Sequence, residues 1–266
     1  MTRAAAALGA LYLVPTPLDF GCQTESHTLC PIEQLLPDET LDRAARLTHW
    51  IAENAKSARA FLKRIETAKG LAVPLQAQHI VELPRAVHKK GDHAPASGEA
   101  AAKTLLAPAL LGHDIGLVSE AGMPAVADPG SSVGRAAHAL GLEVHPLVGP
   151  VSLMMALAAS GLHGQDFAFV GYVPQDTNER AKRLRELESL ALKSGQTQIL
   201  IETPYRNAAL LQALLQVLHP HTRLAMSCGL NLPQQATRSG LIAEWKSHGF
   251  ATQLPLSLPA VLLIGR

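Results

Sequence analysis

Residues 115–129 read IGLVSEAGMPAVADP and combine the features of a buried strand with those of a ligand-binding loop. The apolar residues 115–118 suit a strand, and the small and acidic residues 119–122 follow it directly. A proline-containing loop then leads through Asp128-Pro129-Gly130 to a helix-like run that begins at Ser131. A strand with such an ending before a helix is a usual ligand site in α/β proteins. Ordinary turns use Gly, Pro and Asp as well.

The chain before residue 148 alternates short apolar runs with amphipathic helical patterns. Asp38 is a plausible helix cap, and Arg64 is expected on the solvent side of its helix. This alternation predicts a mostly parallel, doubly wound sheet, because parallel neighbours are joined by crossover helices. The expected strands are 10–14, 49–53, 78–83, 115–118 and 143–147. One helix is expected to begin at residue 38, and three further helices are expected at 56–67, 97–111 and 131–140.

The second half of the chain has its own set of elements beyond the break at Val148-Gly149-Pro150. This break predicts two α/β domains, residues 1–147 and 148–266. The apolar run 151–159 is rich in Ala and Met, which favours a buried helix over a strand. Further helices are expected at 178–192 and 207–218, and further strands at 167–170, 198–202, 223–228 and 260–264.

The composition of the chain favours a folded protein and argues against several classes of nucleic-acid-binding and membrane protein. Of the 266 residues, 47% are hydrophobic and 17% are charged, which favours a substantial core over disorder. A net charge of +1 gives no global attraction for nucleic acid, and an aromatic content of 4% argues against a base-stacking platform. Three cysteines without CxxC spacing indicate a reducing compartment. No apolar run could span a bilayer and the alanine-rich start lacks a cleavage site, so we expect a cytoplasmic protein without a membrane partner.

Polar, proline-containing loops follow several of the expected strands and would converge at the carboxyl edge of a parallel sheet. No GxGxxG or GxxxxGK[ST] motif follows a strand and no GxSxG elbow occurs, which excludes the usual dinucleotide, P-loop and hydrolase interpretations. His88 and His93 flank Asp92, but without a helical frame or a second cluster we expect no metal. The converging loops are 15–17, 119–122, 128–130, 149–150 and 202–206.

Five segments, in order and spacing, resemble the tetrapyrrole methylase superfamily of S-adenosylmethionine (SAM) methyltransferases. They are LYLVPTPL from Leu11, GLVSEAGMPAVADPG from Gly116, VHPLVGPVSLMMALAASGL from Val144, FAFVGYVP from Phe167 and IETPYR from Ile201. The final apolar run PAVLLIG looks like the last strand of the superfamily. The segments are most similar to the ribosomal RNA branch, whose member methylates a cytidine 2'-hydroxyl in small-subunit RNA.

This resemblance implies a two-domain α/β homodimer with SAM bound in a cleft between the domains. Much of the contact with the cofactor in this superfamily is made by backbone, for which small or rigid residues allow close approach. By match, the implied cofactor contacts are Pro15, Pro17, Ser119, Glu120, Ala121, Gly122, Asp128, Pro129, Gly130, Pro150, Ser152, Ile201, Glu202, Thr203, Pro259 and Ala260.

The chain departs from the ribosomal RNA branch at polar segments. Leu18-Asp19-Phe20-Gly21 stands where the branch has Ile-Gly-Asn-Leu, and Glu53-Asn54-Ala55-Lys56 stands for Glu-Asp-Thr-Arg. His88-Lys89-Lys90 stands for His-Asn-Glu, and residues 228–232, CGLNL, replace Arg-Glu-Leu-Thr-Lys. The SAM-side motifs are kept, while positions expected to touch the methyl acceptor differ. Methyl transfer from SAM is therefore the expected activity, with ribosomal RNA as one acceptor. The alternatives are methylation of a small molecule or tetrapyrrole, and a SAM-binding protein without turnover.

A hydroxyl acceptor needs a group that removes its proton, and four side chains near the expected cleft are candidates. They are Glu53, His88, Glu120 and Asp128. Each carboxylate has the alternative role of a helix cap or a turn hydrogen bond, and His88 that of a plain loop histidine.

Basic residues offer further contacts for an anionic acceptor. Arg59, Tyr205 and Arg206 are placed to orient a phosphate or carboxylate, and Arg206 has the alternative role of capping the following helix by an ion pair. The helix around 179–186 carries four basic residues, which suits RNA phosphates. Glutamates 179, 186 and 188 lie at helical spacing from them, so a solvated, internally paired face is the favoured interpretation.

Overall fold

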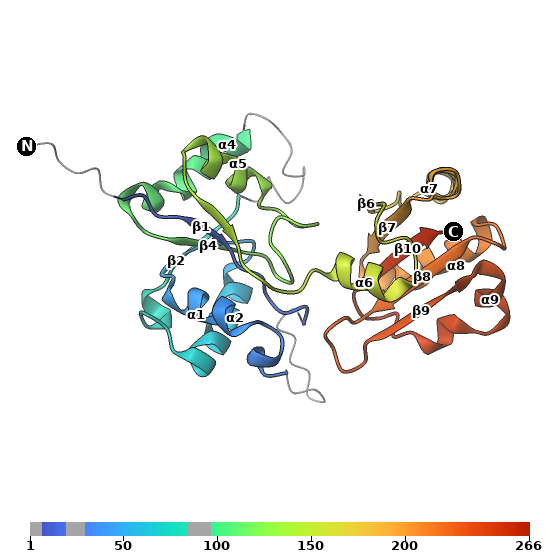
Figure 1. Ribbon diagram of the computed structural model, residues 1–266, viewed down its shortest axis with the longest axis horizontal. Helices are drawn as coiled ribbons and strands as arrows, with labels where there is room; N and C mark the ends of the chain where they lie inside the picture. The colour runs from blue at the N-terminus through green and yellow to red at the C-terminus, as the bar shows by residue number, and fades with distance from the viewer. Residues whose placement is uncertain (1–6, 20–29, 85–96) are drawn as a thin grey trace, which may run out of the picture. The chain divides into compact units, whose positions relative to one another are not determined.

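The computed structural model describes residues 7–19, 30–84 and 97–266 of the chain, which fall into two compact units, Met1–Pro150 and Val151–Arg266. The domain boundary predicted from the sequence lies between residues 147 and 148, at the start of the Val148-Gly149-Pro150 break. Each unit is built around its own sheet (Figure 1).

The sheet of the first unit is entirely parallel among its described strands, in the order β3-β2-β4-β1-β5. Helices α1 and α2 cover one face, and α4 and α5 cover the other (Figure 1). The predicted doubly wound sheet is therefore confirmed. The strands are β1 (Leu11–Leu13), β2 (His49–Ala52), β3 (His79–Glu82), β4 (Ile115–Val118) and β5 (Val144–Pro146); the helices are α1 (Asp38–Arg46), α2 (Ala55–Lys69), α4 (Ser97–Leu105) and α5 (Ser131–Ala139).

Two details of the helices differ from the prediction. The single helix expected over 97–111 is wrong: α4 ends at Leu105, and a 3-10 helix follows at Ala107–Leu111. Pro108 has no backbone N–H to continue the α-helical ladder, which explains the break. Asp38 is the first residue of α1 rather than its cap, because Pro37 occupies the N-cap position without a side-chain hydrogen bond. Short 3-10 helices also lie at Ile32–Gln34 and Leu75–Ala77.

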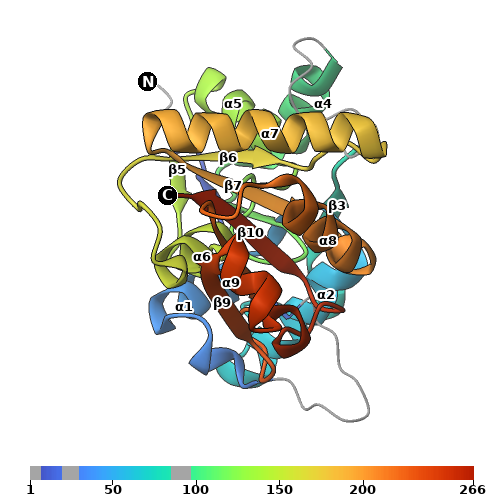
Figure 2. The same ribbon diagram turned by 90° about the vertical axis from the view of Figure 1, so that its right-hand side faces the viewer.

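The second unit has a mixed sheet in the order β6-β7-β10-β8-β9. Only β6 and β7 are parallel; β10 is antiparallel to β7 and β8, and β9 is antiparallel to β8. Helix α6 covers one face, and α7, α8 and α9 cover the other (Figures 1 and 2). The elements are α6 (Ser152–Ser160), β6 (Phe167–Gly171), α7 (Thr177–Ser194), β7 (Thr197–Glu202), α8 (Asn207–Val217), β8 (Arg223–Cys228), β9 (Ala236–Leu241), α9 (Ile242–Ser247) and β10 (Ala260–Gly265), with 3-10 helices at Pro204–Arg206 and Phe250–Gln253.

Burial on both faces explains the continuous apolar sequence of β10. Leu262 and Ile264 pack with the α7–α9 layer, while Val261 and Leu263 pack with α6. The buried helix predicted for 151–159 is confirmed as α6. The hairpin strand β9 and the short helix α9 were not predicted, since residues 236–241 carry polar side chains without a clear alternation.

No helix among the described residues is both long enough and apolar enough to cross a membrane.

Candidate functional site

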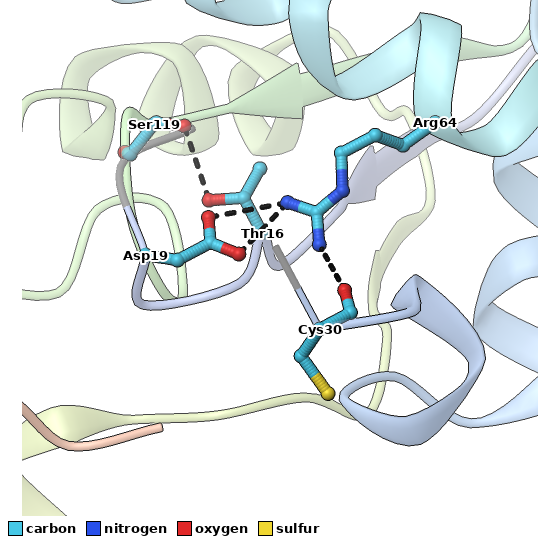
Figure 3. Close-up of polar contacts among 5 residues, drawn as sticks. All are labelled: Thr16, Asp19, Cys30, Arg64 and Ser119. Carbon is cyan, nitrogen blue, oxygen red and sulfur yellow. Dashed lines mark hydrogen bonds and ion pairs between the residues drawn. The ribbon is translucent and has the colours of Figure 1, made fainter. Parts of the chain in front are cut away.

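Two predicted contact loops of the first unit are joined directly. Strands β1 and β4 are neighbours, so the chain after Leu13 emerges beside the chain after Val118. The Thr16 and Gly122 backbones exchange two hydrogen bonds, each 3.0 Å between N and O. The Thr16 hydroxyl also donates to the Ser119 carbonyl at 3.3 Å (Figure 3). Residues 15–17 and 119–122 therefore form one continuous wall at the carboxyl edge of the sheet.

Several residues of this wall and of the loop after it have positive φ values, which few residue types adopt readily. Gly122 has a φ of 81°, and a Cβ added there would lie 3.0 Å from Leu18 Cδ2. Ala125 and Ala127 also have positive φ values, 64° and 66°, which non-glycine residues adopt at a cost. The loop between β4 and α5 is thus held in an uncommon shape up to the Gly130 cap of α5.

The segment containing Pro150 reaches the same edge. A Cβ added at Gly149 would lie 2.2 Å from Pro15 Cγ, so only glycine permits the observed packing against the β1 loop. The Thr40 hydroxyl fixes the preceding residue by donating to the Val148 carbonyl at 2.8 Å. Ser152 follows as the first residue of α6.

Three of the predicted acid–base candidates lie together at this edge. The Glu120 amide donates to Glu53 Oε2 at 3.3 Å, although β2 and the β4 loop are 67 residues apart in sequence. Asp128 is close enough to both carboxylates for their charges to act on it. The fourth candidate, His88, lies outside the described residues, as do Lys89, Lys90, Asp92 and His93.

Asp128 is the unusual group of this cluster. Burial, followed by the charge of Glu53, raises its pKa from 3.8 to about 7, with a smaller contribution from Glu120. The Ser119 hydroxyl acts in the opposite direction, lowering the pKa, although it is not placed for a hydrogen bond of ordinary geometry. A carboxyl group with a pKa near neutrality can hold or accept a proton at physiological pH.

The wall also contains a polar atom that nothing in the described chain satisfies. The Ser119 side chain is 5% exposed, and its Oγ has no hydrogen-bond partner among the described residues. A buried hydroxyl with unused hydrogen-bonding capacity beside a predicted cofactor loop is suited to binding a polar ligand.

In the second unit, the remaining predicted contacts meet at one sheet edge. Ala260 pairs with Glu202 on one side and with Cys228 on the other, because the start of antiparallel β10 lies between the carboxyl ends of β7 and β8. The Gly229 amide donates to the Pro259 carbonyl at 2.8 Å. Residues 201–203 and 259–260 are thus neighbours, which their distance in sequence does not reveal.

Glu202 is buried at this edge and has an ion-pair partner. Its Oε1 accepts from the Thr203 amide at 2.8 Å, and its Oε2 lies 3.0 Å from Nη2 of Arg206. Arg206 occupies the N-cap position of α8, but its side chain makes no cap hydrogen bond, because the guanidinium reaches back to form the ion pair with Glu202. Tyr205, by contrast, is 82% exposed.

The charged residues of α7 and Arg59, proposed as contacts for an anionic acceptor, make contacts within the chain. On α7, Arg183 pairs with Glu186 at 3.3 Å, as the spacing suggests. Glu188 does not pair with the basic residues as predicted; it accepts the His219 amide at 2.7 Å. Arg59 is exposed, with a long contact of 3.5 Å to the Ala55 carbonyl.

A buried ion pair beside the wall was not predicted from the sequence. Arg64 was expected on the solvent side of its helix, but its guanidinium binds the buried carboxylate of Asp19 (Figure 3). The correction has a physical reason: the partner is 45 residues away in sequence, so helical periodicity alone does not reveal it. A lone Asp in the otherwise apolar segment after β1 is the one signal that points to such a partner.

A family model described as Tetrapyrrole (Corrin/Porphyrin) Methylases matches residues 22–245. The chain belongs to this family. Its sequence is similar to proteins named Ribosomal RNA small subunit methyltransferase I, which agrees with the predicted branch. The protein from Neisseria meningitidis serogroup B is 35% identical over 48% of this chain and 42% of its own length. The protein from Mesorhizobium japonicum is 32% identical over 61% of this chain and 54% of its own length. The protein from Halalkalibacterium halodurans is 30% identical over 79% of this chain and 61% of its own length.

The chain thus matches about half the length of these curated relatives. The fold of this tetrapyrrole methylase family protein also matches solved structures over nearly its whole length. Uroporphyrin-III-C-methyltransferase from Thermus thermophilus superposes with a TM-score of 0.52 at 21% identity, covering 97% of this chain and 94% of that one. The methyltransferase CobJ gives a TM-score of 0.54 at 16% identity with the same coverage. At these identities the likeness concerns the fold alone.

Among the described residues, no group of three or more His, Cys, Asp or Glu side chains is arranged to hold a metal ion.

Proposed function

We propose that this protein is a SAM-dependent methyltransferase. The observation that carries the proposal is the wall formed by residues 15–17 and 119–122, in which two predicted cofactor loops are hydrogen-bonded to each other. Family membership supports the same activity. The buried Ser119 hydroxyl, which makes no hydrogen bond of ordinary geometry within the described chain, suits a polar ligand at this wall.

SAM supplies a methyl group activated by a sulfonium, so the chain's own task is to bind, orient and exclude water. In the first unit, we assign binding to Pro15, Pro17 and 119–122, supported by 128–130 and Pro150. In the second unit, we assign it to Ser152, 201–203 and 259–260. Much of this contact would be made by backbone groups, whose positions are fixed by the Thr16–Gly122 hydrogen bonds and by the start of β10.

The acid–base part of the proposal rests on Asp128. Its pKa of about 7 suits a group that takes a proton from a hydroxyl acceptor, since a general base works best when its pKa is near the ambient pH. Glu53 would keep that pKa high through its negative charge. Glu120 is exposed and its amide, rather than its carboxylate, makes the contact with Glu53, so we assign it a role in loop shape.

For the acceptor, we propose a ribose hydroxyl of ribosomal RNA, as the names of the curated relatives suggest. A small molecule or a tetrapyrrole is the second candidate acceptor, because the family model that the chain matches is that of the tetrapyrrole methylases. A cytoplasmic location and a homodimer remain predictions from the sequence.

Calorimetry with SAM and S-adenosylhomocysteine tests the cofactor. The absence of binding at millimolar ligand would remove the proposal. Transfer of labelled methyl groups into small-subunit particles, compared with small-metabolite extracts, tests the acceptor: label only in the extract would exclude RNA. Binding of SAM without formation of S-adenosylhomocysteine in any extract would identify a binding protein without turnover.

A further inference from the structure

A buried ion pair connects the loop after β1 to helix α2. Nη1 of Arg64 donates to both carboxylate oxygens of Asp19, at 3.1 and 2.9 Å (Figure 3). The Asp19 side chain is 4% exposed and that of Arg64 is 17% exposed. A carboxylate at such depth is rarely found unless it is paired, because removing its charge from water is costly. The pair is therefore a strong constraint on where Asp19 lies.

The same guanidinium holds a second point of the chain. Nη2 of Arg64 donates to the Cys30 carbonyl at 3.0 Å (Figure 3). Arginine can do this because its planar fork presents several donors in fixed directions, whereas a lysine ammonium is a single point charge. Arg64 thus binds the chain at two points, the Asp19 carboxylate and the Cys30 carbonyl.

The constraint on Asp19 reaches the cofactor wall through three residues. Leu18, next to Asp19, lies against Gly122, since a Cβ on Gly122 would be 3.0 Å from Leu18 Cδ2. Thr16 exchanges its backbone hydrogen bonds with the same glycine. The segment from β1 to Asp19 is therefore bound at Asp19 to α2 and at Thr16 to the β4 loop.

We propose that Arg64 is a positioning residue that acts through Asp19 to hold the Pro15–Pro17 loop against residues 119–122 in the SAM-binding arrangement. This inference rests on the proposed function. It adds to that function a residue outside the loops assigned to SAM, since Arg64 lies on α2 and reaches the loop after β1 only through Asp19.

The test compares SAM binding by calorimetry in the unaltered protein and in the variants Arg64→Gln, Arg64→Lys and Asp19→Asn. Lys63→Gln is the matched control, since it removes one positive charge from an exposed neighbour on α2 without touching the pair. We expect Arg64→Gln to weaken SAM binding by roughly tenfold, in line with the cost of misplacing a binding group. Arg64→Lys should rescue part of this loss, and Lys63→Gln should leave binding unchanged.

Amide hydrogen exchange separates positioning from general stability. In Arg64→Gln, the Thr16 and Gly122 amides should exchange faster, while amides of β2 and β3 keep their protection. Asp19→Asn keeps the shape of the side chain and should show the same pattern of exchange. This variant therefore provides the test even where Arg64→Gln folds poorly. Unchanged SAM affinity in both variants would overturn the inference alone, and so would a uniform rise in exchange across the unit. Failure of the unaltered protein to bind SAM would overturn the proposed function and this inference with it.

Discussion

Replacing Asp128 by Asn should change how the stability of the first unit depends on pH. In the folded state Asp128 has a pKa of about 7, against an ordinary value of 3.8. Between these values the folded chain binds more protons than the unfolded chain, so the free energy of unfolding falls as the pH rises. Well below pH 3.8 the group is protonated in both states and contributes nothing. Above pH 7 it is ionised in both, and the full cost of its buried charge is present.

The size of this effect follows from the difference between the two pKa values. A difference of about 3 corresponds to about 4 kcal/mol, and since Asp128 is only partly buried we expect about 2 to 4 kcal/mol. Asparagine has nearly the same shape and does not titrate. The unfolding free energy of Asp128→Asn relative to the unaltered protein should therefore rise by this amount between pH 4 and pH 8.

The two tryptophans of the chain allow each unit to be followed separately. Trp50 is 2% exposed in the first unit and Trp245 is 2% exposed in the second. Urea unfolding in a Trp245→Phe background, with Trp50 fluorescence as the signal, reports on the unit that contains Asp128. The control Glu39→Gln removes one exposed carboxylate and should change stability by less than about 0.5 kcal/mol, without a rise toward alkaline pH. A difference for Asp128→Asn that stays flat from pH 4 to pH 8 would refute the reasoning.

Three further changes test the two sheet edges. Glu53→Gln removes a negative charge that raises the pKa of Asp128, so the midpoint of the pH dependence above should move to lower pH; an unchanged midpoint would contradict the coupling. Gly122→Val puts a β-branched residue at a φ of 81°, at a cost of about 1–2 kcal/mol. The free energy of SAM binding, measured by calorimetry, should fall by more than the free energy of unfolding obtained from the melting temperature. Equal losses of the two free energies would make Gly122 only a structural turn. Arg206→Ala leaves the Glu202 carboxylate buried without its cation and should destabilise the second unit by about 3 kcal/mol in urea unfolding followed by Trp245 fluorescence; a loss below about 1 kcal/mol would show that the ion pair contributes little.

The parallel half of the fold could be predicted because its signals are local. Short apolar runs with helices between them indicate parallel strands joined by crossover connections, whereas the strand order β3-β2-β4-β1-β5 was not predicted. The second sheet was harder, because β10 is the last strand in sequence and lies between β7 and β8. Its apolar sequence identifies it as buried, but no local pattern shows that it runs antiparallel to both neighbours. The polar strand β9 gives even less signal.

In the candidate site, too, the features with a local sequence signal could be predicted, and the contacts between distant segments could not. Residues 119–122 could be proposed from the strand ending and the family resemblance alone. The Thr16–Gly122 hydrogen bonds and the contact of Glu120 with Glu53 join segments more than sixty residues apart, so only the folded chain shows them. The same holds for the pKa of Asp128, which depends on burial and on charges from two other segments.

The positions that depart from the ribosomal RNA branch bear on the choice of acceptor. The sequence alone suggests that they changed because the substrate changed. In the folded chain, Asp19 binds Arg64, and Asn54 caps α2 by accepting the Lys56 and Ser57 amides. Cys228 is buried in β8, where burial raises its thiol pKa to about 12. Each of these side chains thus has an internal role that would select it whatever the acceptor is. Three of the departures therefore give no independent reason to exclude an RNA substrate, and the decision falls to the labelled-methyl experiment.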